Sequence, residues 1–144
     1  MSRWLLDTNV VSELRKPRPD RNVLAFVKAQ PLERLFISVV TLAEIRFGIE
    51  RLADADVRFA FSEWLTQHVR PMFEQRVLPV SEDVLFKWRV AVAEGRAAGI
   101  TYPQPDLFIA ATALHYGMTV VTRDSAGFAR TGVSLFDPWQ NQPL

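Results

Sequence analysis

The chain has 144 residues, 49% of them hydrophobic, so its composition suits a folded domain with one full-sized core and argues against disorder. Lys and Arg number 17 against 16 Asp and Glu, and the formal charge of +1 excludes a global basic field that would attract nucleic acid. Any nucleic-acid binding must therefore come from local clustering of basic residues or from metal ions that bridge to phosphate.

The sequence has no cysteine, which excludes disulfides and thiolate metal sites and fits a reducing compartment. No apolar run approaches the roughly 20 residues that a membrane helix needs. A signal peptide is not expected either, because Asp7 interrupts the N-terminal apolar run at once. We therefore expect a cytoplasmic protein without a membrane partner.

The chain begins with a short apolar run, Trp4–Leu6, that has strand length and stops at Asp7. A helical pattern follows, with Val10, Val11 and Leu14 on one side. A buried strand that turns straight into a helix places the carboxylate at the carboxyl edge of a sheet, where ligands bind in open α/β folds. Asp7 is therefore the first candidate for a functional site.

Strand-like and helical segments alternate along the rest of the chain. Strands are predicted at 35–38, 77–80 and 118–122, with 134–136 as a candidate edge strand. Helices are predicted at 20–30, 39–52, 56–69 (closed by Pro71), 81–98 and 106–116, and 123–131 is a loop or a short helical turn. The alternation predicts an α/β fold with a mostly parallel sheet of four to five strands covered by helices on both faces. With no internal repeat and no long linker, residues 1–144 are expected to form a single domain.

Four acidic residues lie where strands end or helices begin: Asp7, Glu44 about two turns into the helix after the second strand, Asp106 and Asp124. In a parallel sheet these positions can share one edge. Clustering several acids there is costly unless cations neutralise them, and an all-oxygen set suits Mg²⁺ or Mn²⁺. Two such ions can activate a water and stabilise the leaving oxygen of a phosphodiester.

Each acid also has a purely structural interpretation. Asp7 and Asp106 are typical helix caps or helix-start residues, Asp124 is a typical turn former, and Glu44 can lie on a solvated helix face. Each interpretation is reasonable alone. That all four acids should fall at one sheet edge for unrelated reasons is the weaker hypothesis.

Four blocks together resemble a known family: Leu6–Val10, Ala43–Gly48, Pro105–Ala113 and Val121–Asp124. In this order and spacing they resemble the PIN-domain ribonucleases, above all the VapC-type and FitB-type toxins of bacterial toxin–antitoxin pairs. The resemblance implies a three-layer sandwich and Mg²⁺- or Mn²⁺-dependent endonucleolytic cleavage of RNA by a metal-activated water. It also implies a homodimer and a cognate antitoxin, with tRNA among the candidate substrates.

The resemblance carries the family's catalytic metal-binding acids over to Asp7, Glu44, Asp106 and Asp124, and its small polar residue near the metal to Thr8 or Thr122. One position departs from the family pattern. Many relatives have Asn in place of Asp124 and an Asp three residues later, where this chain has Gly127. The fourth acid is therefore either Asp124 or absent.

Some residues outside this set leave alternatives open. The basic run Arg15, Lys16, Arg18 and Arg21 can track an RNA backbone or be a solvated proline-rich loop. Glu13 can be a fifth acid, but a solvated helix face is the favoured interpretation. The aromatic residues of 59–73 cannot all face inward, so some are expected to form an exposed apolar patch.

Two other functions compete with the ribonuclease. A phosphatase of the haloacid-dehalogenase type also begins with a strand ending in Asp, but it needs a second Asp two residues on, where this chain has Asn9. The other alternative is a PIN-like binding or scaffold module with a degenerate site, supported only by Gly127. Metal binding separates this module from an enzyme.

Overall fold

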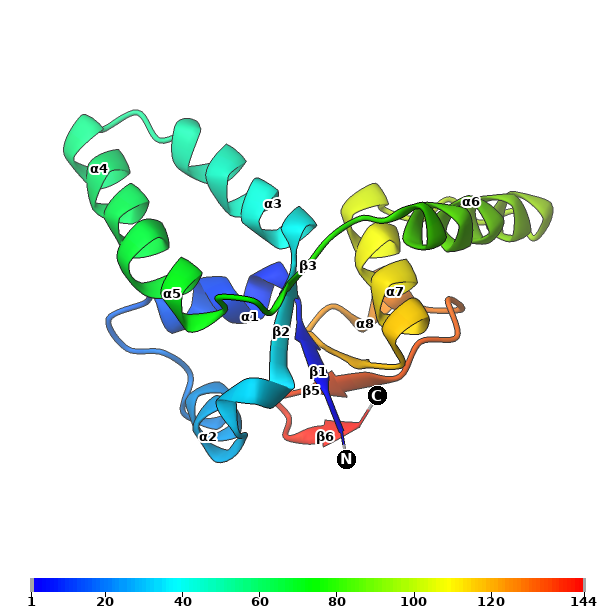
Figure 1. Cartoon of the computed structure of the whole chain (residues 1–144), viewed down its shortest axis with the longest axis horizontal. Helices are drawn as coiled ribbons and strands as arrows, with labels where there is room; N and C mark the ends of the chain where they lie inside the picture. The colour runs from blue at the N-terminus through cyan, green and yellow to red at the C-terminus, as the bar shows by residue number, and fades with distance from the viewer. Residues whose placement is uncertain (1, 144) are drawn as a thin grey trace.

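The computed structural model describes residues 2–143 and contains a six-stranded sheet in the order β3-β2-β1-β4-β5-β6 (Figure 1). The strands are β1 (Trp4–Leu6), β2 (Leu35–Ser38), β3 (Val77–Leu78), β4 (Thr119–Val121), β5 (Leu135–Asp137) and β6 (Gln142–Pro143). All neighbouring strands are parallel except the antiparallel pair β5–β6. The mostly parallel sheet predicted from the sequence is therefore confirmed.

The sheet has one strand more than the four to five predicted. β6 follows Asn141, whose φ of 54° lies in the left-handed region, and it pairs with β5 through Asp137 and Gln142. A strand of two residues that ends in proline carries no alternating apolar pattern, so periodicity cannot reveal it.

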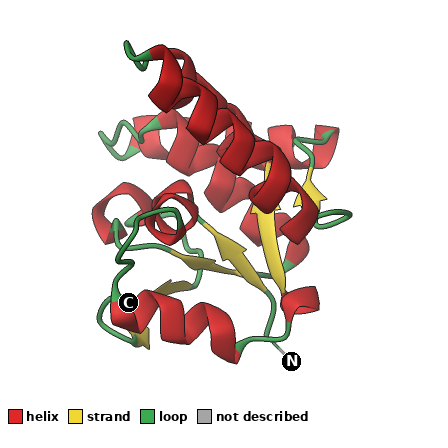
Figure 2. Cartoon of the chain, turned by 90° about the vertical axis from the view of Figure 1, so that its left-hand side faces the viewer, coloured by secondary structure: helices red, strands yellow, loops and turns green. Residues whose placement is uncertain are grey.

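Helices cover both faces of the sheet (Figure 2). They are α1 (Thr8–Leu14), α2 (Arg21–Ala29), α3 (Val39–Glu50), α4 (Ala55–Trp64), α5 (Arg70–Met72), α6 (Glu82–Ala97), α7 (Gln104–Tyr116) and α8 (Ser125–Phe128), with a 3₁₀ turn at Leu32–Arg34 and a π turn at Leu65–Val69. Because successive strand residues face opposite sides, the strands feed two cores. Leu5 and Val120 pack with residues of α7 and α8, whereas Leu6 and Val121 pack with residues of α1, α2 and α3. The three-layer sandwich is therefore confirmed.

The helix predicted to end at Pro71 instead continues beyond it. After α4 the chain makes the π turn and passes without a break into α5, which contains Pro71. The N–H of Arg70 bonds the carbonyl of Leu65, five residues earlier, so the regular α-helical ladder is already interrupted where Pro71 offers no N–H. Leu65, Val69 and Phe73 are buried at i, i+4 spacing and hold this segment against the core. Burial of this segment therefore outweighs the tendency of Pro71 to end the helix.

The helices also pack in pairs outside the sheet. Helices α3 and α4 lie on one side of the view in Figure 1, and α6 and α7 on the other, with each pair in contact. Within residues 2–143, no helix combines the length and the apolar character needed to cross a bilayer.

Candidate active site

Asp7 lies at the carboxyl ends of β1 and β4, as the sequence predicts. Its backbone N–H donates to the carbonyl of Val121 at 3.0 Å, so the β1–β4 ladder fixes the residue directly. Its side chain is buried, with 5% exposed. Oδ1 accepts a hydrogen bond from the backbone N–H of Thr8 at 2.8 Å, which makes Asp7 the N-cap of α1. The helix cap and the candidate ligand are therefore the same carboxylate.

The other oxygen of Asp7 belongs to a polar network that crosses from β1 to β4. The hydroxyl of Thr122 donates to Asp7 Oδ2 at 2.8 Å and accepts from Asn9 Nδ2 and from the backbone N–H of Asp124, each at 3.0 Å. Thr122 is fully buried. The Thr8 hydroxyl instead donates to Thr41 of α3 at 3.2 Å. Of the two threonines proposed from the sequence, Thr122 is therefore the one whose hydroxyl contacts the Asp7 carboxylate.

Asn9 is a member of this network that the sequence analysis did not single out. Its Nδ2 also lies 3.4 Å from Asp7 Oδ2, and its Oδ1 is buried without a hydrogen-bond partner in the described part of the chain. Buried polar atoms are rarely left unpaired, so this oxygen is available to a ligand or a water at the site. Its place in Leu-Asp-Thr-Asn, two residues after Asp7, was the signal available in the sequence.

Asp106 and Asp124 reach the same edge from α7 and from the loop after β4. Helix α7 begins at Gln104, two residues earlier than predicted, because Pro105 is tolerated in a first turn whose N–H groups have no helical partners. Asp106 is therefore a half-buried first-turn residue. Asp124 is exposed and caps the four-residue helix α8 by accepting from the N–H of Gly127 at 3.2 Å.

Gly127 lies beneath these two carboxylates. A Cβ at this position would fall 2.0 Å from Asp106 Oδ2 and 2.9 Å from Asp124 Oδ2. The space that a side chain at 127 would need is therefore filled by Asp106. The departure from the family pattern does not leave a gap, because Asp106 and Asp124 meet where the glycine leaves room.

Glu44 lies at the rim of this cluster. It is exposed on α3 and lines a cavity of about 180 Å³ together with Thr8 and Ser12 of α1. Its charge contributes to raising the pKa of both Asp7 and Asp106, which places it within electrostatic reach of them. The apolar neighbours Ala43 and Ile45 do not bury it.

The pKa values of the two more buried acids are raised first by burial and then by the like charges around them. Burial is the main cause that raises the pKa of Asp7; hydrogen bonds from Thr122 and Thr8 oppose it, and the charges of Asp124 and Glu44 add to it. Burial also raises the pKa of Asp106 to about 7, followed by the charges of Asp7 and Asp124 and a hydrogen bond shared with Asp124. All four predicted acids are therefore coupled at one sheet edge.

The donor set fits a hard divalent cation. Every candidate ligand is an oxygen, and the unpaired Oδ1 of Asn9 adds a neutral one. In the side-chain arrangement of residues 2–143, no group of three Asp, Glu or His residues is placed to hold a metal ion by itself. Mg²⁺ is commonly bound through one or two carboxylates, several waters and substrate phosphates, so it does not require such a cage.

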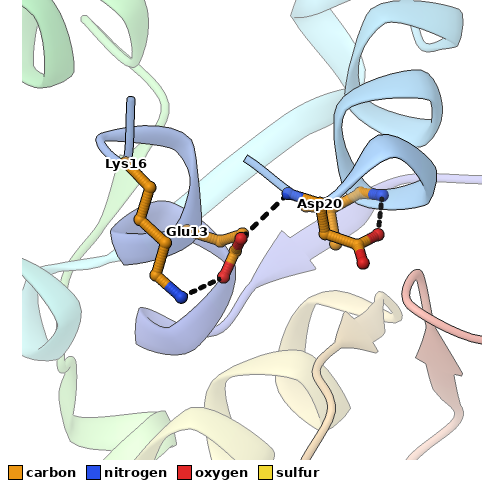
Figure 3. Close-up of polar contacts among 4 residues, drawn as sticks. Glu13, Lys16 and Asp20 are labelled. Carbon is orange, nitrogen blue, oxygen red and sulfur yellow. Dashed lines mark hydrogen bonds and ion pairs between the residues drawn. The ribbon is translucent and has the colours of Figure 1, made fainter. Parts of the chain in front are cut away.

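Glu13 corrects one sequence expectation, because it is buried rather than on a solvated face, with 6% exposed. Oε1 lies 2.8 Å from Lys16 Nζ, and Oε2 accepts from the backbone N–H of Asp20 at 2.9 Å (Figure 3). The hydrogen bond from Lys16, and then that from Asp20, lower the pKa of Glu13 despite its burial. Glu13 thus ties the end of α1 to the start of α2 and is not a fifth acid of the cluster.

The sequence matches the PIN domain family over residues 4–133. It is 39% identical over 136 residues to VapC ribonuclease Y4jK of Sinorhizobium fredii, covering 94% of this chain and 97% of the relative. It is 35% identical over 137 residues to toxin FitB of Neisseria gonorrhoeae, covering 95% and 99%. The crystal structure of FitAcB from Neisseria gonorrhoeae matches with a TM-score of 0.88 at 35% identity, over 94% of this chain and 98% of that chain. The chain therefore belongs to the PIN-domain family, in the group that includes the VapC ribonucleases and the FitB toxin.

Proposed function

We propose that this chain is the metal-dependent endoribonuclease toxin of a toxin–antitoxin pair and hydrolyses RNA phosphodiester bonds. The observation that carries the proposal is the buried Asp7, fixed by Thr122 and Thr8, with the carboxylates of Asp106 and Asp124 meeting beside it. Membership of the PIN family and 39% identity to a VapC ribonuclease support the same activity. Neither fits the haloacid-dehalogenase alternative.

In this proposal Asp7, Glu44, Asp106 and Asp124 hold one or two divalent cations, with Mg²⁺ as the resident ion and Mn²⁺ as its substitute. A bound cation of this kind polarises a phosphoryl oxygen and lowers the pKa of a coordinated water. Two hydrogen bonds fix the Asp7 carboxylate in its orientation before any ligand arrives. Burial raises the pKa of Asp106 to about 7, and a bound cation would favour the charged form of this carboxylate.

The proposed antitoxin partner fits a groove beside the active site. The groove has a volume of about 340 Å³ and is lined mainly by apolar side chains of α1, α4 and α5, among them Leu14, Trp64 and Met72. An amphipathic segment of a partner buries its apolar face in such a groove. The toxin name of the FitB relative supports an antitoxin as that partner.

A homodimer is proposed from a second apolar surface. Leu85, Phe86 and Val90 of α6 and Leu114 of α7 are 42%, 60%, 40% and 42% exposed. These side chains lie exposed on two helices that pack together, and exposed apolar surface marks interaction sites. With no membrane span in the described residues, we propose that the protein works in the cytoplasm.

The test is cleavage of a mixed pool of tRNA and other structured RNA by the purified protein, with Mg²⁺, with Mn²⁺ and with a chelator. The Asp7→Asn variant is prepared identically. Asn keeps the helix cap but loses the charge, so we expect a folded protein without metal-dependent cleavage. Asp54→Asn is the matched control, because the Asp54 carboxylate also caps a helix, α4, without belonging to the site.

The proposal is supported if the wild type and Asp54→Asn give discrete products and Asp7→Asn gives none. Full activity of Asp7→Asn, or cleavage that persists in chelator, contradicts it. If no RNA is cut and calorimetry detects no metal binding, the protein is the binding or scaffold module instead.

A further inference from the structure

Arg15 is the first residue after α1, the helix that Asp7 caps at its other end. Its guanidinium carbon lies 4.2 Å from the centre of the Phe61 ring of α4. Arg15 lines the same cavity as Thr8 and Glu44. The cavity therefore connects a stacked guanidinium to the rim of the acidic cluster.

No carboxylate among the described residues neutralises the charge of Arg15. Within residues 2–143 it forms no ion pair, and the nearby carboxylate of Glu13 is already occupied by Lys16 and by the N–H of Asp20 (Figure 3). Contact with the Phe61 ring restrains the guanidinium, and among the described residues its N–H groups donate no hydrogen bond. A held but unpaired guanidinium is suited to a phosphate, which it binds through two parallel hydrogen bonds.

We propose that Arg15 is a substrate-positioning residue, which binds a backbone phosphate of the RNA near the phosphodiester at the acidic cluster. The inference rests on the proposed ribonuclease function. Seven residues of α1 span about 10 Å, which corresponds to about three nucleotides of a stacked strand. Arg15 thus fixes the register of the strand, and Phe61 fixes Arg15.

The rest of the basic run lies on the same loop. Glu13 contacts Lys16 and Asp20, and these two contacts restrain the segment 16–20, which includes Arg18. Arg18 and Arg21 are exposed, and neither forms an ion pair among the described residues. Arg18 and Arg21 therefore add positive charge to the segment that follows Arg15, which suits a nucleic-acid backbone.

An antitoxin is the competing occupant, because Arg15 also borders the apolar groove. The RNA is favoured since the polar members of the cavity, Thr8 and Glu44, belong to the acidic edge. A residue that serves only the partner would not change the salt dependence of RNA binding. That readout separates the two.

The experiment compares Arg15→Ala with Arg51→Ala on a single-stranded RNA substrate at several KCl concentrations. Arg51 is the matched control, because it also caps the end of a helix and lies over a phenylalanine ring, Phe47, at 5.3 Å. It does not line the cavity. Both variants are first checked for an unchanged thermal melting curve.

For Arg15→Ala we expect an increase in KM of about 10-fold, with kcat changed much less, because a charge-assisted hydrogen bond to a phosphate is lost. The slope of log KM against log salt concentration should fall by about 0.7, the value for one phosphate contact on a single strand. Arg15→Lys should keep the slope and raise KM less, and Phe61→Leu should raise KM in the same direction. Arg51→Ala should match the wild type.

The inference is overturned if Arg15→Ala keeps the KM and the salt slope of the wild type. It is equally overturned if the variant loses affinity only for the antitoxin. RNA binding by fluorescence anisotropy in the Asp7→Asn background makes the two failures distinguishable. A wild-type protein that does not cut RNA contradicts the proposed function. The salt dependence of RNA binding, measured by anisotropy, still decides whether Arg15 binds RNA.

Discussion

Gly127→Ala gives the sharpest test of how Asp106 is held in place. The added Cβ would lie 2.0 Å from Asp106 Oδ2 and 3.0 Å from Asp106 Cγ, so the carboxylate cannot stay where it is. The obstacle is the end of a side chain and not the backbone, so Asp106 can rotate away. The fold should survive while the acidic cluster rearranges.

The two effects of the change differ in size. Moving Asp106 off its preferred rotamer costs about 0.5–1.5 kcal/mol, and Ala recovers up to about 1 kcal/mol in helix propensity, so the free energy of unfolding should fall by about 1.5 kcal/mol or less. For a chain of this length that lowers Tm by about 6 °C at most. Displacing a ligand by 1 Å or more costs about 100-fold in rate. Activity should therefore collapse while stability hardly changes.

The assay pairs kcat for RNA cleavage at saturating Mg²⁺ with Tm by circular dichroism. Gly48→Ala calibrates the gain in helix propensity, because a Cβ at that position of α3 meets nothing within 4 Å. Its free energy of unfolding should rise by up to about 1 kcal/mol. If Gly127→Ala cleaves RNA at the wild-type rate, the position of the Asp106 carboxylate over Gly127 has no catalytic importance and the reasoning fails.

Two further predictions concern the same cluster. The pKa of Asp106 is raised to about 7 from an ordinary 3.8, and the pKa of Asp7 is raised as well, so the folded state binds protons more tightly than the unfolded state. The metal-free protein should therefore lose stability as pH rises from about 4 to 7. The gain in Tm on adding Mg²⁺ should grow over the same range. A gain in Tm that is independent of pH would contradict this. Thr122→Val should lower the free energy of unfolding by about 1–3 kcal/mol in urea titrations, since the part-buried donors of Asn9 and Asp124 lose their acceptor. Thr112→Val is the control, because this equally buried hydroxyl only donates to the carbonyl of Phe108 in its own helix; equal effects of the two changes would argue against the network.

Sequence patterns predicted the layers of this fold because burial leaves a periodic trace. Apolar Leu5 and Leu6 next to each other indicate a strand buried on both faces, and the structure places them in two different cores. Local stop signals were less reliable. Pro105 lies in a first turn, where proline is harmless, and Pro71 follows a π turn within a continuous helical stretch, so the helix boundaries inferred from these prolines were displaced.

The acids of the site were predictable because each stands next to a strand end or a helix start. Contacts between segments that are far apart in the sequence were not predictable. The link between Thr122 and Asp7 spans 115 residues, and no local pattern indicates it. Glu13 has the spacing of a solvated helix position, and only the fold of the following loop buries it. Gly127 was recognised as a departure, but its consequence depends on where Asp106 lies.

The two outermost strands limit how this protein can assemble. β3 and β6 have two residues each; Pro79 directly follows Leu78, the last residue of β3, and Pro143 lies within β6. Such edges offer few free amides, so an incoming peptide cannot extend the sheet as an added strand. Fibrillar growth through the sheet is disfavoured for the same reason. Association must therefore proceed through helical surfaces, where side-chain shape rather than backbone pairing selects the partner.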